Sequence, residues 1–133
     1  MYPNFYAYPA FLYYDDDGIS IEFPDLPGCL PCAKTTEEAF KNAQEALGLH
    51  LYGMECDNDP IPEPSDLKTL RAEDGAVVTM IDVFMPAIRD RINNRVVKKT
   101  LTIPAWLNRK AEAAHVNFSQ ILQDGLKQYL GER

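Results

Sequence analysis

The last third of the chain holds one short strand and two helices, which is too little material to form a core alone. Residues 98–103 alternate polar and apolar side chains, as a strand with one exposed face does. Pro104 then suits the first position of a helix, because proline lacks the N–H that would be unpaired there. A second helix is predicted to begin at Asn117, with Gln120 at the spacing of an N-terminal cap, and to end at Gly131.

This segment constrains the fold more than any other feature of the sequence. Roughly 33 residues are fewer than the ~40 below which a chain usually needs staples or oligomerisation. The single strand would also leave both of its edges unpaired. Both problems disappear when two copies pair their strands antiparallel across a two-fold axis and interlock their helices. The sequence therefore predicts a homodimer through this segment, with Trp106 and Tyr129 in its core or interface. A further pairing of the N-terminal parts would give a tetramer.

Charge divides the chain into two unlike parts. Residues 1–87 carry 4 Lys+Arg against 16 Asp+Glu, a net charge of −12, whereas residues 88–133 carry 9 against 4, a net charge of +5. An acidic module attracts basic proteins and repels nucleic acid, and a basic module attracts polyanions. The whole-chain charge of −7 therefore describes neither part, and two modules with different partners are predicted.

The basic C-terminal segment resembles the ribbon-helix-helix family of DNA-binding proteins, on residues 98–104 and 117–122. In that family a two-stranded ribbon enters the major groove, and its outward side chains read the base edges. The resemblance implies that the matching side chains here contact bases: Lys98, Thr100 and Thr102. It implies phosphate contacts from the ribbon and from the start of the second helix: Lys99, Asn117, Phe118 and Ser119. The alternative is a dimerisation module that binds no DNA.

The N-terminal half is predicted to be α+β, a small antiparallel sheet with one packed helix. Residues 6–14 are rich in strand-forming aromatic side chains, and residues 19–23 alternate apolar and polar ones. Between them, Asp17-Gly18 predicts a two-residue type I′ turn. A short third strand is expected over residues 29–34. The strand at residues 77–83 is apolar on both faces, so we expect it in the centre of the sheet.

A helix is predicted to begin at Thr35 or Thr36, because Thr35 and Glu38 have the spacing of a capping box. Its apolar stripe needs a sheet to cover and contains Phe40, Ala43, Leu47, Leu51 and Met54. Three parts of the chain follow from this order of elements. They are an acidic domain over residues 1–84, a linker or short helical connector over 85–97 and a basic domain over 98–133.

The N-terminal domain resembles the HicB-type antitoxins. The resemblance rests on an acidic hairpin, a strand, a proline-glycine stretch and a helix, at residues 14–18, 19–23, 24–29 and 36–47. Proteins of this family have a partial ribonuclease-H-like fold, of order βββαβ, without nuclease activity. They neutralise a small basic toxin of HicA type that cleaves messenger RNA, and they repress their own operon through a C-terminal DNA-binding domain. The resemblance therefore implies a non-enzymatic antitoxin with two partners, the toxin and operator DNA.

The toxin-binding surface is expected among the acidic residues, because their charge would steer a basic partner and cover its RNA-binding face. The candidates are Asp15, Asp16, Asp17, Glu22 and Asp25. One alternative is a ligand-sensing repressor without a toxin partner. Another is a metal-dependent nuclease built on the three successive acids. Such acids at a hairpin tip point in different directions, however, so a solvated turn is the favoured interpretation.

No cofactor, metal site or catalytic residue is predicted. Cys29, Cys32 and Cys56 lack the second pair or the histidines of a tetrahedral zinc site, so we expect three reduced cysteines that pack. His50 borders the apolar stripe without an acid, thiol or serine partner at a suitable spacing. No apolar run reaches the roughly 20 residues of a membrane span, and the first residues do not resemble a signal peptide. A cytoplasmic protein is therefore expected.

Overall fold

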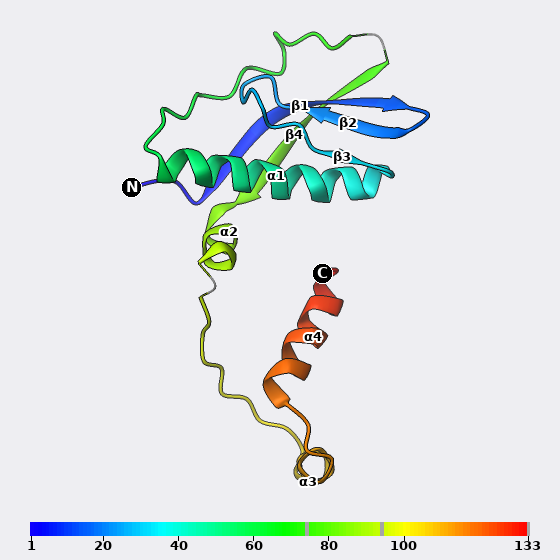
Figure 1. The fold of residues 1–133 in the computed structure, drawn as a ribbon, viewed down its shortest axis with the longest axis vertical. Helices are drawn as coiled ribbons and strands as arrows, with labels where there is room; N and C mark the ends of the chain where they lie inside the picture. The colour runs from blue at the N-terminus through cyan, green and yellow to red at the C-terminus, as the bar shows by residue number, and fades with distance from the viewer. Residues whose placement is uncertain (74, 94, 133) are drawn as a thin grey trace. The chain divides into compact units, whose positions relative to one another are not determined.

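A computed structural model describes residues 1–73, 75–93 and 95–132 of the 133 residues. The chain divides into two compact units, Met1–Val96 and Val97–Arg133. In the described residues, the first unit contains an antiparallel sheet with two helices, and the second contains two more helices (Figure 1). This architecture confirms the predicted α+β class.

Four strands form one antiparallel sheet in the order β3-β2-β1-β4. Their bounds are Phe5–Asp15 for β1, Gly18–Glu22 for β2, Cys32–Ala33 for β3 and Ala76–Phe84 for β4. β1 pairs with both β2 and β4, so β1 is a central strand. The prediction that residues 77–83 lie in the centre was wrong, because β4 is an edge strand of the described sheet. Apolar side chains on both faces of a strand report how its faces are covered, not whether both of its edges are hydrogen-bonded.

The side chain of Asp15 stabilises the turn of the β1–β2 hairpin. Its Oδ1 accepts the amide of Asp17 at 2.8 Å and the amide of Gly18 at 3.0 Å. The two loop residues are therefore Asp16 and Asp17, and neither has the positive φ that a type I′ turn requires. The turn was therefore predicted one residue too late, at Asp17-Gly18, and with the wrong type. An Asp side chain can bond the amides that follow it, which allows a turn without positive φ at its two loop residues.

Helix α1 spans Thr36–Cys56 and packs one face on the sheet. The Thr35 hydroxyl accepts the amide of Glu38 at 3.2 Å, which confirms the predicted start of the helix. The side chains buried along its apolar face are Ala39, Ala43, Leu47 and Leu51. Phe40 is 40% exposed, so its place in the buried stripe was wrong. The stripe begins one position earlier, at Ala39, whose small side chain fits where the start of the helix meets the sheet.

The core lies between α1 and one face of the sheet. Its fully buried side chains include Tyr8, Leu12, Ile21, Phe23, Leu26, Leu47 and Leu51. Phe11 is also buried but lies outside this cluster, because successive side chains of β1 point to opposite faces. All three cysteines are free, yet only Cys29 packs in the core. The prediction was wrong for Cys32 on β3 and for Cys56 at the end of α1, which are exposed.

Helix α2 spans Met85–Ile92 and follows β4 directly. Met85 is fully buried, and Ile88 packs against the core. The first part of the segment 85–97 is therefore helical, and two of its apolar side chains, Met85 and Ile88, belong to the core of the first unit.

The second unit contains α3, Ala105–Ala113, and α4, Phe118–Leu130. The Asn117 side chain caps α4 by accepting the amide of Gln120 at 3.0 Å, and Gly131 ends α4 with a left-handed φ of 70°, both as predicted. Pro104 is the N-cap of α3, one position before its predicted place inside the helix. Residues 98–103 form neither helix nor strand in this single chain, since a strand exists only where a neighbouring strand bonds to it.

Candidate functional site

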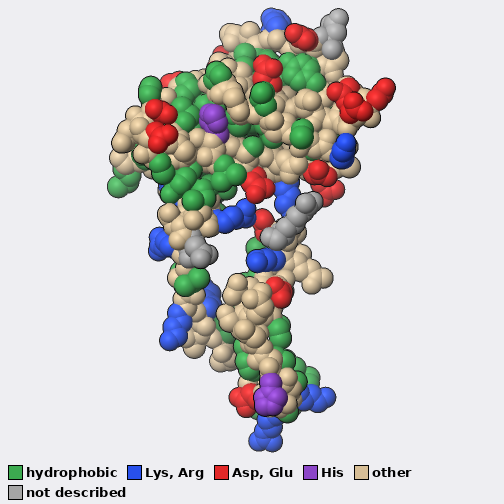
Figure 2. All heavy atoms as spheres, in the orientation of Figure 1, with side chains coloured by type: hydrophobic (Ala, Val, Ile, Leu, Met, Phe, Trp, Pro, Cys, Tyr) green, Lys and Arg blue, Asp and Glu red, His purple; other side chains and the backbone are tan. Residues whose placement is uncertain are grey.

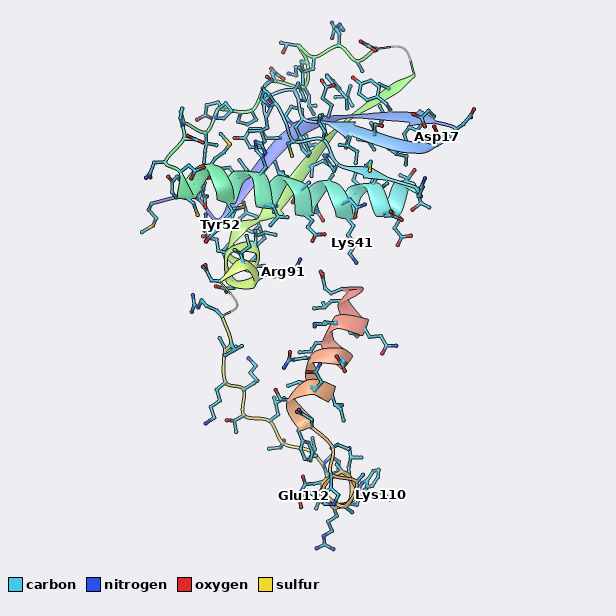
Figure 3. The ribbon with its side chains drawn as sticks, viewed as in Figure 1. Asp17, Lys41, Tyr52, Arg91, Lys110 and Glu112 are labelled. Atoms are coloured by element: carbon cyan, nitrogen blue, oxygen red, sulfur yellow. The ribbon has the colours of Figure 1, made fainter. Side chains whose placement is uncertain are left out.

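The five acidic candidates lie at separate places on the first unit. Asp15, Asp16 and Asp17 form the tip of the β1–β2 hairpin, and Figure 3 shows Asp17 at its outer end. The carboxylate of Asp15 is engaged by the turn, and the carbonyl oxygen of Asp17 accepts Lys34 Nζ at 2.9 Å. Asp16 and Asp17 are exposed, so their carboxylates are the charges that the tip presents to solvent.

Glu22 and Asp25 lie at the end of β2 and in the loop that follows it. Glu22 is half-buried, and it lies opposite Phe11 in the pairing of β2 with β1. Asp25 accepts the amide of Ser65 at 2.9 Å and the hydroxyl of Ser65 at 2.5 Å. The Asp25 carboxylate therefore stabilises a contact between two loops, which is a structural role that the sequence did not indicate.

A buried ion pair joins α1, α2 and β1. Glu55 is 7% exposed, and its carboxylate accepts Arg89 Nη2 at 2.8 Å, Arg89 Nε at 3.1 Å and the Tyr6 hydroxyl at 2.9 Å. Burial, followed by the hydrogen bond to Glu55 and its charge, raises the pKa of Tyr6 above its ordinary value. The hydrogen bond to Glu55 also raises the pKa of Arg89. The sequence carried one signal of this site, an acid four residues after Leu51 on the apolar stripe.

A groove of about 420 Å³ opens between the start of β1 and the loop that follows α1. Its wall contains aromatic and proline side chains together with two carboxylates, and it includes Phe5, Tyr6, Tyr8, Pro62, Asp59 and Glu63. Sequence patterns could not reveal it, because its two walls are more than fifty positions apart in the chain, as the hydrogen bond from Tyr8 to Pro62 shows (|i−j| = 54).

The C-terminal candidates all lie on exposed parts of the second unit. Lys98, Lys99, Thr100 and Thr102 are in the segment before α3, whereas Asn117, Phe118 and Ser119 are at the start of α4. Residues 97–133 carry 6 Lys+Arg against 3 Asp+Glu, a net charge of +3. In Figure 2, Lys and Arg side chains are spread over this part of the chain. The Asn117 side-chain oxygen is already engaged as the cap of α4, so the groups it can still offer a ligand are its amide donors.

The apolar side chains of the second unit are left in water. No residue of α3 or α4 is buried. The exposed apolar residues of this unit include Leu101, Ile103, Leu107, Ile121, Leu122 and Leu126. Trp106 is 63% exposed and Tyr129 is 88% exposed, so neither lies in a core of the single chain. Helices with such exposed faces are stabilised by a partner that covers them.

Neither a metal-binding group of side chains nor a membrane-spanning helix occurs among the described residues. In residues 1–73, 75–93 and 95–132, no three His, Cys, Asp or Glu side chains are grouped so that they could hold a metal ion. Over the same residues, every helix is too short or too polar to cross a membrane. His50 is half-buried on α1.

Comparison with known proteins gives the family. Residues 8–124 match the model of the HicB-like antitoxins of bacterial toxin-antitoxin systems. A toxin-antitoxin complex from Streptococcus pneumoniae contains a chain with a TM-score of 0.61 and 25% identity, a match that covers 94% of this chain and 99% of that one. The Burkholderia pseudomallei antitoxin HicB has the same fold, with a TM-score of 0.55, 21% identity and coverage of 94% and 98%.

A similar protein also occurs in a bacterial virus. An uncharacterized 14.9 kDa protein from the rep-hol intergenic region of Haemophilus phage HP1 is 29% identical over 103 residues, which are 75% of this chain and 74% of that protein. The family match extends over both units of the chain, from β1 to α4. The chain therefore belongs to the family of HicB-like antitoxins of bacterial toxin-antitoxin systems.

Proposed function

We propose that this chain neutralises a small basic toxin of HicA type with its first unit and represses its own operon by binding operator DNA with its second. The observation that carries this proposal is the division of charge between two compact units. The first unit carries 7 Lys+Arg against 17 Asp+Glu, a net charge of −10, and the second carries +3. The negative charge of the first unit suits a basic protein, and the positive charge of the second unit suits a polyanion.

Toxin binding by the first unit is supported by the family and by a structural neighbour that is part of a toxin-antitoxin complex. We assign a partial ribonuclease-H-like fold without nuclease activity to this unit. Its toxin-facing charges are assigned to Asp15, Asp16, Asp17, Glu22 and Asp25. Among these, Asp16 and Asp17 are the strongest candidates, because their carboxylates are exposed and the turn engages Asp15 instead.

DNA binding by the second unit is assigned to a ribbon-helix-helix dimer. Exposed apolar side chains on α3 and α4 support dimerisation, because a second copy would bury them. Residues 98–103 of two copies would pair as an antiparallel ribbon with three outward side chains on the base edges: Lys98, Thr100 and Thr102. Phosphates would contact Lys99 and the start of α4, at Asn117, Phe118 and Ser119, because the first amides of a helix have no partner within the helix and suit an anion. Pairing of two such dimers through the first units would give a tetramer.

The test separates the two activities. The full chain is co-expressed with its proposed partner, a small basic toxin of HicA type, and growth, complex formation and binding to the upstream DNA are measured. We expect the chain to restore growth, to form a stable complex and to bind the upstream DNA as a dimer.

Other results would identify the alternatives. Binding to DNA without binding to the basic protein would favour a ligand-sensing repressor. Mg²⁺-dependent cleavage of RNA that disappears in Asp15→Asn or Asp17→Asn would show a nuclease.

A further inference from the structure

The groove beside β1 exists because β2 is shorter than β1. β1 pairs with β4 from Phe5 to Tyr13, but β2 pairs with β1 only from Phe11 to Asp15. In the described sheet, the stretch of β1 before Phe11 therefore has no strand on its β2 side. The loop at residues 59–64 runs beside this stretch instead, and the Tyr8 hydroxyl donates to the carbonyl of Pro62 at 2.5 Å.

The aromatic rings of the groove are held in place. The rings of Tyr6 and Tyr8 stack with centroids 6.3 Å apart and planes at 28°. The Tyr2 hydroxyl donates to the carbonyl of Glu55 at 3.1 Å, and the Tyr6 hydroxyl donates to the Glu55 carboxylate. Phe5 is 64% exposed and contacts Phe84 with ring centroids 4.9 Å apart. Fixed aromatic faces attract cations, and the guanidinium of arginine stacks on them.

The groove is negatively charged. Asp59 and Glu63 line it, and its described lining includes no Lys or Arg. Arg89 Nη2 donates to the carbonyl of Pro3 at the rim, but the Arg89 charge is paired with Glu55 at 2.8 Å. Burial raises the pKa of the Tyr8 hydroxyl, and the charges of Glu63 and Asp25 raise it further.

We propose that this groove binds an arginine side chain on an exposed segment of the basic toxin. Aromatic faces and two carboxylates around a cavity of about 420 Å³ match a planar cation with a flexible apolar stem. The source of the arginine rests on the proposed function, whereas the chemistry of the groove does not. The groove is separate from the acidic tip of the hairpin, so it adds a second contact site for the toxin.

The first experiment tests the groove with a defined probe. N-acetyl-arginine amide is titrated into the full chain and followed by NMR, with N-acetyl-citrulline amide as the neutral probe of the same shape. We expect saturable shifts at the accessible rings of Phe5 and Tyr6 with the arginine probe, and at least fivefold weaker binding of the citrulline probe. Equal binding of the two probes, or shifts spread over the whole unit, would overturn the proposal.

Matched variants test the two carboxylates. Asp59→Asn with Glu63→Gln removes two charges from the groove, and Glu37→Gln with Glu38→Gln removes two from the first turn of α1, where Glu37 is exposed and Glu38 is half-buried. We expect the groove variant to bind the arginine probe at least fivefold more weakly and the α1 variant to change binding less than twofold. An equal loss of probe binding in both variants would show a general charge effect and would refute the proposed arginine site.

The second experiment uses the proposed partner, a small basic toxin of HicA type. The groove variant should weaken its complex with the full chain at least tenfold, while the α1 variant should weaken it less than threefold. An unchanged affinity in the groove variant would overturn the assignment of the groove to the toxin. If the full chain does not bind that protein at all but still binds the arginine probe, the toxin function fails and the cation site stands.

Discussion

Arg89 on α2 donates two hydrogen bonds to the carboxylate of Glu55 on α1, from Nη2 at 2.8 Å and from Nε at 3.1 Å. The Glu55 side chain is 5% exposed and the Arg89 side chain is 24% exposed, so the pair lies at the boundary of the core. The Tyr6 hydroxyl donates to the same carboxylate at 2.9 Å. These hydrogen bonds compensate the buried charge of the Glu55 carboxylate and hold α2 against α1 and β1.

Arg89→Met should destabilise the first unit, because Glu55 would stay buried without its cation. We expect a loss of about 3 kcal/mol in the free energy of unfolding measured in urea. Glu55→Gln combined with Arg89→Met should recover most of that loss. The control is Arg91→Met, whose pair with Glu45 at 3.7 Å is exposed at both side chains, and which should cost less than about 0.5 kcal/mol. Equal losses in the two arginine variants would contradict this prediction.

Two glycines of α1 should respond to alanine in opposite ways. A Cβ at Gly48 would lie 2.7 Å from Ile88 Cγ1 and 3.1 Å from Val83 Cγ2, whereas a Cβ at Gly53 would meet nothing within 4 Å. Gly48→Ala should therefore cost about 2 kcal/mol by overpacking the contact between α1 and α2. Gly53→Ala should stabilise the chain by about 0.5–1 kcal/mol through helix propensity. Thermal unfolding of both variants measures this, and the same sign for both would refute it.

The Cys29 thiol should resist modification and should make stability fall at high pH. Burial raises its pKa from 9.0 to about 11. Below pH 9 both the folded and unfolded thiols are protonated, so stability does not depend on this group. Between about pH 9 and 11 only the unfolded thiol ionises, so stability is lost as pH rises. The pKa of Tyr6 is also raised from 10.0 by burial and by Glu55, so the loss of stability continues above pH 10, where the unfolded Tyr6 ionises first.

Thiol labelling and a variant check this prediction. A chromogenic disulfide at pH 8 should label the exposed Cys32 and Cys56 in the native chain, and Cys29 only after unfolding. In Cys29→Ala, the decline in stability between pH 9 and 10 should become shallower. Rapid native labelling of all three thiols would show that Cys29 is not protected.

Leu126→Glu on α4 should prevent dimerisation, because a charge would replace an apolar side chain in the proposed interface. Leu126 is 52% exposed in the single chain, so the variant leaves the core of the first unit intact. A cost of about 3 kcal/mol corresponds to a dimer dissociation constant more than 100-fold weaker. Sedimentation equilibrium measures it. Gln120→Glu adds the same charge to the polar side of α4 and should leave the dimer unchanged, and identical dimer affinities in the two variants would rule out this interface.

Lys98→Ala and Thr100→Ala should each weaken binding to the upstream DNA by about 1–3 kcal/mol, because each removes a base contact of the proposed ribbon. Lys99→Ala should weaken binding to all DNA sequences alike and lower the salt slope by about one. Fluorescence anisotropy at several salt concentrations measures both effects. Lys68→Ala on the first unit serves as the control. Unchanged DNA affinity in Lys98→Ala and Thr100→Ala, or a parallel loss of toxin binding, would refute the ribbon assignment.

The elements that depend on neighbouring residues could be predicted. Thr35 caps α1 and Asn117 caps α4, in each case through an amide three residues along the chain. Gly131 ends α4 because glycine adopts a left-handed φ without a steric cost. The hairpin was located to within one residue for the same reason, but its exact loop residues and its type depended on a side-chain bond from Asp15 that two turn residues alone do not specify.

The candidate site could be predicted only in part. The acids at the hairpin tip are exposed as expected, but Asp25 is held by Ser65, forty positions later in the chain. The role of Glu55 could not be predicted, because its cation, Arg89, lies 34 positions away in the chain. A charge pattern shows how many carboxylates a segment holds. It does not show which of them are bonded to other residues of the same chain.

By itself, the sequence determined the helix caps and ends, the division of charge between the two units and the apolar faces that need covering. Each of these properties follows from the chemistry of residues close together in the chain. Only the tertiary structure decided that β4 lies at an edge of the sheet, that Arg89 meets Glu55 and that a loop meets β1 to form a groove. These contacts join distant segments, and their geometry depends on how the whole core packs rather than on any local pattern.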